Sequence, residues 1–190
     1  MNRKVSKEEA EAAVRVLLEY IGEDLTREGI KDTPARVVKS YDELFAGYTV
    51  KVEELLDKKF CEVGPANDII LLRSINFSSV CEHHMLPFWG KVDIAYLPQD
   101  CVVGISKIAR IVDTFARRLQ IQERMTASIA EALQTNINPK GVAVKISAYH
   151  KCMKARGVLK TEPLMDTVYF TGAFKEQQEL RQQFYVMLKG

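Results

Sequence analysis

The clearest strand in the sequence is Val142-Ala143-Val144-Lys145-Ile146-Ser147-Ala148-Tyr149. Its even-numbered positions are apolar while Lys145, Ser147 and Tyr149 alternate with them, which predicts a strand with one buried face. If the strand continues past Ala148, His150 and Cys152 fall on the same buried side. A histidine and a cysteine in a core-facing row need polar or metal partners there, because burying them unpaired is unfavourable.

The other predicted elements surround this strand in a regular order. Two strands joined by a turn come before it, then two helices, and one further strand and a polar terminal helix follow it. Paired strands with helices between the pairs predict an α+β domain, an antiparallel four-stranded sheet of ββααββ order with helices on one face. The predicted ranges are strands 68–77, 88–97 and 165–174 and helices 106–119, 122–137 and 175–188.

The N-terminal third is predicted to be helical. Ser6 to Glu9 fits a capping box, and Thr33-Pro34 is typical of a second helix start. Gly64-Pro65 interrupts the pattern before the first strand. We therefore expect a helical extension over residues 1–66 and one compact catalytic domain over residues 67–190.

Composition excludes several classes of protein. The chain has 190 residues, of which 47% are apolar and 27% charged, and a formal net charge of +2. So small a net charge argues against a nucleic-acid binder that relies on massed phosphate contacts. The apolar runs are too short for a membrane span, and the charged start does not resemble a secretory signal. We expect a cytoplasmic protein with neither a nucleic-acid nor a membrane partner.

The three histidines and four cysteines are unevenly distributed. His83 and His84 stand in Cys81-Glu82-His83-His84, and His150 is followed by Lys151-Cys152. A disulfide framework is the first explanation to weigh, but a chain of this length without an export signal neither requires nor favours one. We therefore expect Cys61 and Cys101 to be plain thiols, and the mixed clusters to serve a metal or catalysis.

The mixed clusters predict a zinc site formed by Cys81, His84 and Cys152. Cys81 and His84 are three residues apart, so one tight turn can aim both at a single point, and thiolate with imidazole selects zinc. Two alternatives are ordinary buried residues and a structural zinc site, which usually has four protein ligands. Three ligands leave one position for water, and His83 and His150 remain nearby as proton carriers.

Two further stretches suggest a substrate. Gly104-Ile105-Ser106-Lys107-Ile108-Ala109-Arg110 opens a helix with cations in its first turns, which favours anion binding, although a solvated helix start explains it equally well. Arg156, four residues beyond Cys152, either adds a cation on the metal side or belongs to an ordinary turn with Gly157. Glu123 has two possible roles. Its negative charge stabilises a helix N-terminus, or its carboxylate accepts hydrogen bonds from two adjacent donors, such as the N1–H and the amine of guanine.

Four ordered motifs together resemble the GTP cyclohydrolase I family. They are Ser79-Val80-Cys81-Glu82-His83-His84-Met85-Leu86-Pro87-Phe88, the Gly104–Arg110 stretch, Arg118-Leu119-Gln120-Ile121-Gln122-Glu123-Arg124, and His150-Lys151-Cys152-Met153-Lys154-Ala155-Arg156-Gly157. Asp32-Thr33-Pro34-Ala35-Arg36-Val37 is also similar to that family's helix opening. The resemblance extends from about Gly29 to Phe174.

The resemblance implies a tunnelling fold, a homodecamer of two pentameric rings, and active sites at subunit interfaces. It implies conversion of GTP and water to formate and 7,8-dihydroneopterin triphosphate, the entry to folate or pterin synthesis, with zinc-activated water attacking C8 of guanine. Cys81, His84 and Cys152 would hold zinc, and His83 and His150 would move protons. Glu123 with Gln122 would anchor the guanine edge, and the triphosphate and ribose would be held by Ser106, Lys107, Arg110, Arg156, Lys39 and Arg36.

The sequence departs from the family pattern in two places. Asp93 stands where the family usually has histidine, and the stretch Thr161 to Phe170 lacks several of its usual serines and threonines. The second departure leaves alternatives open. They are a relative that uses another purine nucleotide or stops at the formamidopyrimidine stage, and a non-catalytic zinc- or nucleotide-binding module.

Overall fold

The computed structural model of the chain describes residues 3–62 and 68–189. Two compact units divide the chain, Met1–Ala46 and Gly47–Gly190. The boundary expected after residue 66 lies outside the described residues, as does the Gly64-Pro65 break. None of the described helices is long and apolar enough to cross a membrane.

The first unit consists of two helices, α1 (Lys7–Tyr20) and α2 (Thr33–Leu44). The capping box is confirmed, because the Glu9 N–H donates to Ser6 Oγ at 3.2 Å and the Ser6 N–H donates to the Glu9 carboxylate at 2.9 Å. Asp32 rather than Thr33 is the N-cap of α2, and Pro34 lies in its first turn, where its missing N–H costs nothing. The N-terminal third is thus helical, as the sequence predicts.

The second unit has a five-stranded sheet in the order β5-β2-β3-β6-β7. The four long strands pair antiparallel, which confirms the α+β class: β2 (Ile70–Cys81), β3 (Pro87–Leu97), β6 (Gly141–His150) and β7 (Met165–Phe170). The fifth strand, β5 (Leu119–Gln120), pairs parallel with the end of β2. Two residues show no period that a sequence pattern can reveal, so this strand was not expected.

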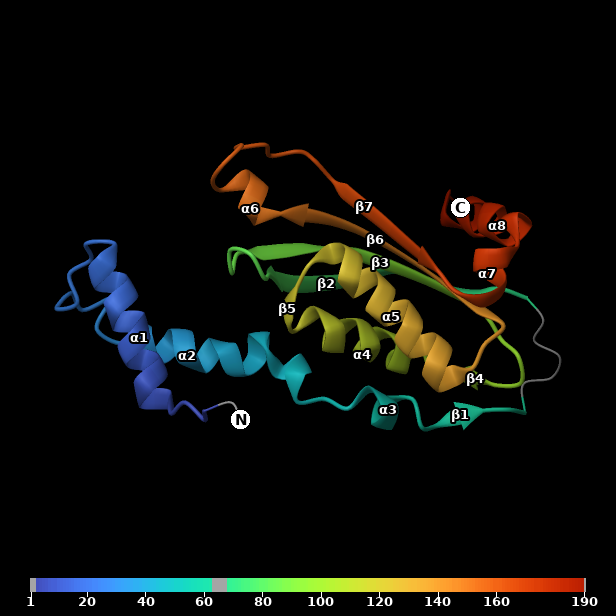
Figure 1. Ribbon diagram of the computed structural model, residues 1–190, viewed down its shortest axis with the longest axis horizontal. Coiled ribbons are helices and arrows are strands. Elements are labelled where there is room, and N and C mark those ends of the chain that lie inside the picture. Colours follow the sequence, from blue (N-terminus) through green and yellow to red (C-terminus); the bar gives the residue numbers. More distant parts are fainter. Residues whose placement is uncertain (1–2, 63–67, 190) are drawn as a thin grey trace. The chain divides into compact units, whose positions relative to one another are not determined.

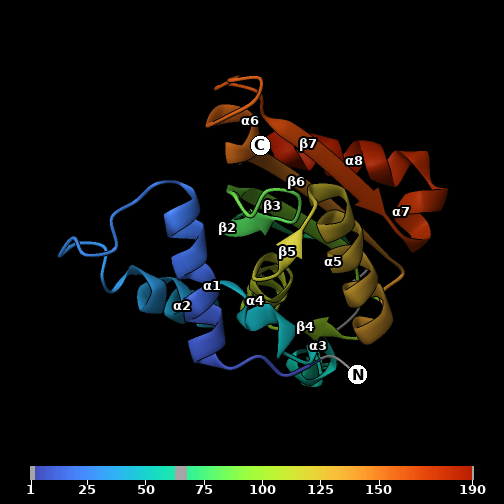
Figure 2. The same cartoon turned by 60° about the vertical axis from the view of Figure 1, so that its left-hand side comes forward.

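Helices lie on both faces of the sheet, and the expectation of one covered face is wrong. The long helices α4 (Ile105–Ala116) and α5 (Gln122–Ile137) cover the main core (Figures 1 and 2). The C-terminal segment forms α7 (Gly172–Glu176) and α8 (Gln178–Lys189), which bury Phe174 and Phe184 against the opposite face. Leu180, Phe184 and Leu188 recur every four residues, an apolar stripe within a helix that otherwise reads as polar.

Short elements complete the second unit and lead into its site. They are a 3-10 turn (Ala46–Tyr48), α3 (Val52–Leu55), β1 (Lys59–Phe60), β4 (Val102–Val103) and α6 (Lys151–Lys154). Leu56, directly after α3, is 1% exposed and packs in the main core. The segment that follows α2 therefore belongs to the second unit through its apolar contacts.

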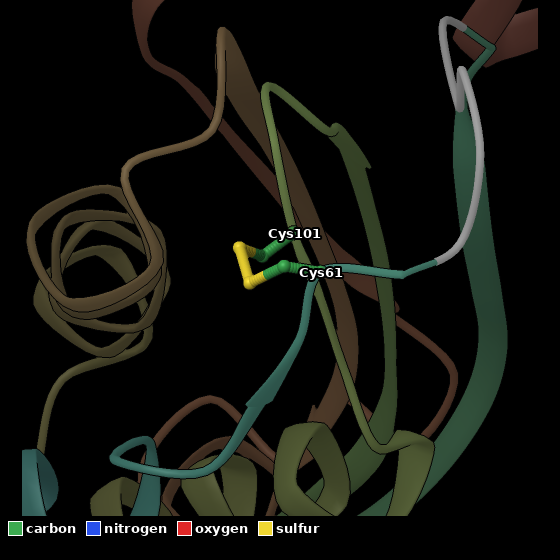
Figure 3. Close-up of a disulfide and its surroundings, with 2 residues drawn as sticks. All are labelled: Cys61 and Cys101. Atoms are coloured by element: carbon green, nitrogen blue, oxygen red, sulfur yellow. A yellow bond between two sulfur atoms is a disulfide. The ribbon is translucent and has the colours of Figure 1, made fainter.

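Cys61 and Cys101 form a disulfide, so the expectation of two plain thiols is wrong (Figure 3). The two-residue strands β1 and β4 pair antiparallel, with Lys59 opposite Val103 and Phe60 opposite Val102. Continuing this register by one residue brings Cys61 opposite Cys101, and their Cα atoms are 4.1 Å apart. No sequence pattern predicts this contact, because the strand pairing that creates it involves only two residues on each side.

Removing this disulfide should destabilise the second unit. The cysteines are 40 residues apart in the sequence, and the loop-closure entropy for that separation corresponds to a stabilisation of about 4 kcal/mol. We expect the double variant Cys61→Ser/Cys101→Ser to unfold at a lower urea concentration than the wild type when both proteins are measured at the same zinc concentration. A thiol titration of denatured, unreduced wild type should find only the two free cysteines, Cys81 and Cys152. Four reactive thiols would contradict the bond.

Asp93, which departs from the family pattern, stabilises a bulge in the sheet. The register of β2 against β3 shifts between Leu72 and Ile75, and Ser74 there has a φ of 58°. The Ser74 N–H donates to Asp93 Oδ1 at 2.8 Å, so the carboxylate takes a donor that the interrupted ladder leaves free. The substitution thus has a structural explanation that is independent of the metal residues.

We expect Asp93→Ala to lower the free energy of unfolding by about 1 kcal/mol, since it removes the acceptor for this N–H. Asp93→Asn should retain most of the stability, because its amide oxygen can accept the same hydrogen bond. Chemical denaturation of both variants measures the difference. Equal losses in the two variants would show that charge, not the hydrogen bond, is what matters at this position.

Candidate active site

The first two metal-ligating residues lie on the turn between β2 and β3. Cys81 ends β2 and is buried, and the chain then turns through Glu82 to His84. Two backbone hydrogen bonds close the turn: Met85 N–H donates to Cys81 O, and Cys81 N–H donates to Leu86 O, both at 2.9 Å. Met85 adopts a φ of 53°. As predicted from their spacing, a tight turn brings the side chains together, with Cys81 Sγ 4.0 Å from His84 Nδ1.

Cys152 reaches the same point from a different element than expected. Strand β6 ends at His150, and Cys152 lies in the single helical turn of α6, so the strand does not continue through it. The ligand atoms of Cys81, His84 and Cys152 nevertheless all lie within 4.8 Å of one another. Burial, followed by the neighbouring Cys81, raises the pKa of the Cys152 thiol.

This donor set fits zinc. Two sulfurs and one imidazole are the ligands that zinc prefers, and their mutual distances allow one ion to contact all three. A structural zinc site usually has four protein ligands. Among the described residues, no other histidine, cysteine or carboxylate side chain adds a fourth ligand to the group. A three-ligand set with one position open to water or substrate is typical of catalytic zinc.

His150 is held firmly at the end of β6. It stands opposite Phe88 in the sheet register, and the two rings stack with centroids 4.8 Å apart and planes within 5°. Burial lowers the pKa of His150, and the negative charge of Glu123 acts in the opposite direction. The ring plane is therefore fixed by Phe88, a contact that only the strand register reveals.

Gln122 is the first residue of α5, and its side chain contacts His150. Its side chain is almost fully buried, and its Oε1 lies 2.9 Å from His150 Nε2. Its Nε2 has three acceptors within hydrogen-bond distance, Ile146 O at 3.0 Å, Met165 O at 2.9 Å and Thr167 Oγ1 at 3.1 Å, which share its two hydrogens. Every polar atom of this side chain thus has a partner within the protein.

His83 is not part of the metal-ligating group, although its ring centroid lies 6.2 Å from that of His84. Its side chain is 62% exposed, and its Nε2 lies 3.8 Å from Glu82 Oε1. Glu82 in turn accepts from the Arg124 guanidinium of α5, which holds the pKa of that carboxyl below its ordinary value. This ion pair connects the metal turn to the start of α5, and no sequence pattern predicts it.

Arg156 and Glu123 both lie on the metal side. Arg156 Nη1 lies 3.2 Å from His84 Nε2, which brings a cation beside the ligand group as expected. Glu123 is exposed in the first turn of α5, next to Gln122 and close enough to His150 to influence its pKa. The structure thus gathers a metal-ligating group, an imidazole, a carboxylate and a guanidinium at one end of the sheet.

The expected anion residues do not join this group within one chain. Ser106, Lys107 and Arg110 lie in the first turns of α4, while the end of α4 leads through β5 to the metal turn. Helix α4 has 12 residues, so it is about 18 Å long, with about 13 Å between the middles of its first and last turns. Figure 1 shows β4, which precedes α4, and β5, which follows it, at opposite ends of the sheet.

The remaining two expected substrate residues belong to the first unit. Arg36 and Lys39 are exposed on α2, and Arg36 forms an ion pair with Asp32 at 3.3 Å. Neither residue has a described contact with the metal-ligating group.

An α+β sheet that carries a three-ligand thiolate–imidazole site at the end of its strands defines a class of metal-dependent enzyme. Within that class, the family model of GTP cyclohydrolase I matches residues 10–189, and the chain belongs to this family. The GTP cyclohydrolase 1 of Rickettsia bellii is 57% identical over 182 residues, which cover 96% of this chain and 95% of the relative. That of Rickettsia felis is 58% identical over 181 residues, 95% of each.

Among solved structures, the apo archaeosine synthase QueF-Like is similar to part of the chain. It has a TM-score of 0.47 and 20% sequence identity, and the match covers 58% of this chain and 97% of that one.

Proposed function

We propose that this chain opens the imidazole ring of GTP at C8, releases formate and forms 7,8-dihydroneopterin triphosphate for folate or pterin synthesis. One observation carries the proposal: Cys81, His84 and Cys152 bring two sulfurs and an imidazole within 4.8 Å of one another in a chain of this family. These three residues would hold zinc, which when bound activates water for attack on an electrophilic carbon.

The residues around the metal divide the remaining chemistry. His150 would exchange protons with the substrate from a ring held by Phe88 and Gln122. His83, exposed and beside Glu82, would serve as a second proton carrier. Glu123 would accept from the N1–H and amine of guanine with its two carboxylate oxygens, with Gln122 close by.

The triphosphate would be bound at the start of α4, where Ser106, Lys107 and Arg110 add a hydroxyl and two cations to free backbone N–H groups. Arg156 would bind it on the metal side, and Lys39 and Arg36 would come from a neighbouring subunit. Because Ser106, Lys107 and Arg110 lie at the other end of α4 from the metal turn of their own chain, we expect one GTP to contact the start of α4 of one chain and the metal turn of another. This separation supports a homo-oligomer of tunnelling-fold subunits, with two pentameric rings as the expected arrangement.

Complementation between inactive chains tests the shared site. Cys152→Ala removes a metal ligand, and Lys107→Ala/Arg110→Ala removes the anion cations. After the two variants are mixed and reassembled, about one quarter of the sites should combine an intact metal turn with an intact α4 start. Activity should therefore reappear on mixing. Activity that stays at the sum of the two separate variants would contradict a site shared between chains.

A single incubation tests the reaction itself. Zinc-loaded protein with GTP should release formate and yield a product that becomes fluorescent like a pterin after oxidation, and a chelator should abolish both. A panel of GTP, dGTP and ATP separates this reaction from that of a relative with another purine substrate. A formamidopyrimidine product would show that the reaction stops after ring opening. Binding of GTP without formate release would indicate a non-catalytic module.

A further inference from the structure

The buried amide of Gln122 has only one favourable orientation. Its Nε2 faces the carbonyl oxygens of Ile146 and Met165 at 3.0 and 2.9 Å. Carbonyl oxygens only accept hydrogen bonds, so a flipped amide would place Oε1 against two acceptors with no hydrogen between them. At 1% exposure no water can relieve that repulsion.

A chain of hydroxyl groups fixes the same orientation independently. Thr126 Oγ1 donates to Gln122 O at 2.7 Å, so its hydrogen is already used. The 2.7 Å contact between Thr126 and Thr167 must then use the Thr167 hydrogen. Thr167 Oγ1 is left to accept from Gln122 Nε2, at 3.1 Å. The donors therefore run in one direction, from Gln122 Nε2 through the Thr167 and Thr126 hydroxyls to the backbone carbonyl oxygen of Gln122.

This orientation determines which nitrogen of His150 carries a hydrogen. With Nε2 of Gln122 committed to acceptors, its Oε1 faces His150 Nε2 at 2.9 Å and can only accept. His150 must therefore bear its hydrogen on Nε2, and Nδ1 is the nitrogen left for other partners. Stacking on Phe88 fixes the ring plane, so Gln122 determines the remaining variable, the tautomer.

We propose that Gln122 is a positioning residue that acts through His150, rather than a residue that reads the guanine base. This deepens the proposed function, on which it rests. The Gln122 side chain is 1% exposed, its Nε2 hydrogens are used on acceptors within the protein and its Oε1 accepts from His150, so base recognition falls to the exposed carboxylate of Glu123.

A spectroscopic experiment tests the tautomer without any turnover. Histidine labelled with ¹⁵N in the ring gives only three sets of signals in this chain, and solid-state NMR of the zinc-loaded protein is not limited by oligomer size. We expect His150, assigned by the loss of its signals in His150→Asn, to show a protonated Nε2 and an unprotonated Nδ1. A protonated Nδ1 with a bare Nε2 would overturn the proposal, even if the protein did not act on GTP.

Kinetics test the role of Gln122 against a matched control. Gln122→Met should lower kcat for GTP by about 10- to 100-fold and leave KM within about twofold, with zinc retained. Gln120→Met is the control, because Gln120 is 4% exposed and donates to Phe115 O at 2.9 Å but has no described contact with His150. The control should retain kcat within about twofold. A raised KM with unchanged kcat would assign Gln122 to the substrate instead.

A double variant separates positioning from general loss of structure. In a His150→Ala background, Gln122→Met should change kcat by less than about twofold, because the residue through which it acts is gone. Independent, multiplying losses would show that Gln122 does not act through His150. If zinc-loaded wild type released no formate from GTP, the proposed function would be contradicted. The NMR signals of the His150 ring nitrogens would still show whether Gln122 determines the tautomer of His150.

Discussion

Cys152→Ala should release the metal and abolish turnover. We expect zinc to fall from about one ion per chain to a small fraction, because two ligands bind it far more weakly than three. Formate release should fall at least about 10³-fold, since an activated water is worth several kcal/mol to the reaction. Metal analysis after gel filtration and a formate assay measure the two effects. An unchanged zinc content would overturn the ligand assignment.

A neighbouring residue provides the control for this experiment. Met153 lies in the same helical turn as Cys152, and its side chain is exposed. Met153→Ala should keep both zinc and activity, so a loss confined to Cys152→Ala cannot be attributed to damage to α6. It would instead reflect the missing sulfur.

The same thiol makes zinc binding depend on pH. The pKa of Cys152 is raised by burial and by Cys81, so its thiol is protonated at neutral pH until a metal displaces the proton. Zinc affinity should therefore rise with pH and fall as the solution becomes more acidic. Calorimetric titrations in buffers of different ionisation enthalpy measure the protons released on binding.

His150→Ala should retain zinc and lose most turnover. A positioned proton carrier contributes about 10²- to 10⁴-fold to a rate, and we expect kcat to fall within that range. His150 is not among the three residues whose ligand atoms form the metal-ligating group, so metal content should remain near the wild-type value. Parallel metal analysis and formate assays distinguish this result from that of Cys152→Ala. Normal turnover in His150→Ala would remove it from the mechanism.

His83 provides a comparison with different solvent access. Its side chain is 62% exposed, whereas that of His150 is stacked on Phe88 and bonded to Gln122. We expect His83→Ala to lose turnover as well. Added imidazole should restore more activity to His83→Ala than to His150→Ala, because free imidazole reaches the open position more easily.

The main sheet could be predicted from the sequence because its strands are long and periodic. The alternation from Val142 to Tyr149 marks β6, and α5 has the predicted ends, Gln122 and Ile137. A two-residue strand is too short to show any periodicity in the sequence. The β1–β4 pairing was therefore missed, and with it the Cys61–Cys101 disulfide. The apolar stripe of α8 was missed because Leu180 lies among charged and amide side chains, while Phe184 to Leu188 is an unbroken apolar run that shows no period.

The metal-ligating group could be predicted because rare residue types cluster at short spacing. The element that contains Cys152 was predicted wrongly. Cys152 lies in a helical turn rather than in a continued strand, and either element can direct its side chain to the same point. The support of His150 could not be predicted. Gln122 is 28 residues away in the sequence, and its contact with His150 depends on how α5 packs against β6 and β7. Such contacts follow from tertiary packing, which composition and spacing do not encode.

The length of α4 has a consequence for the number of working sites. It holds the anion residues of each chain at a fixed distance from the metal turn of the same chain. If each site is shared between neighbours, every chain supplies half of two different sites. An open row of chains would then leave an unmatched half at each end, whereas a closed ring matches every half. Closure of the assembly would therefore be a condition for full catalytic capacity, in addition to any stability it provides.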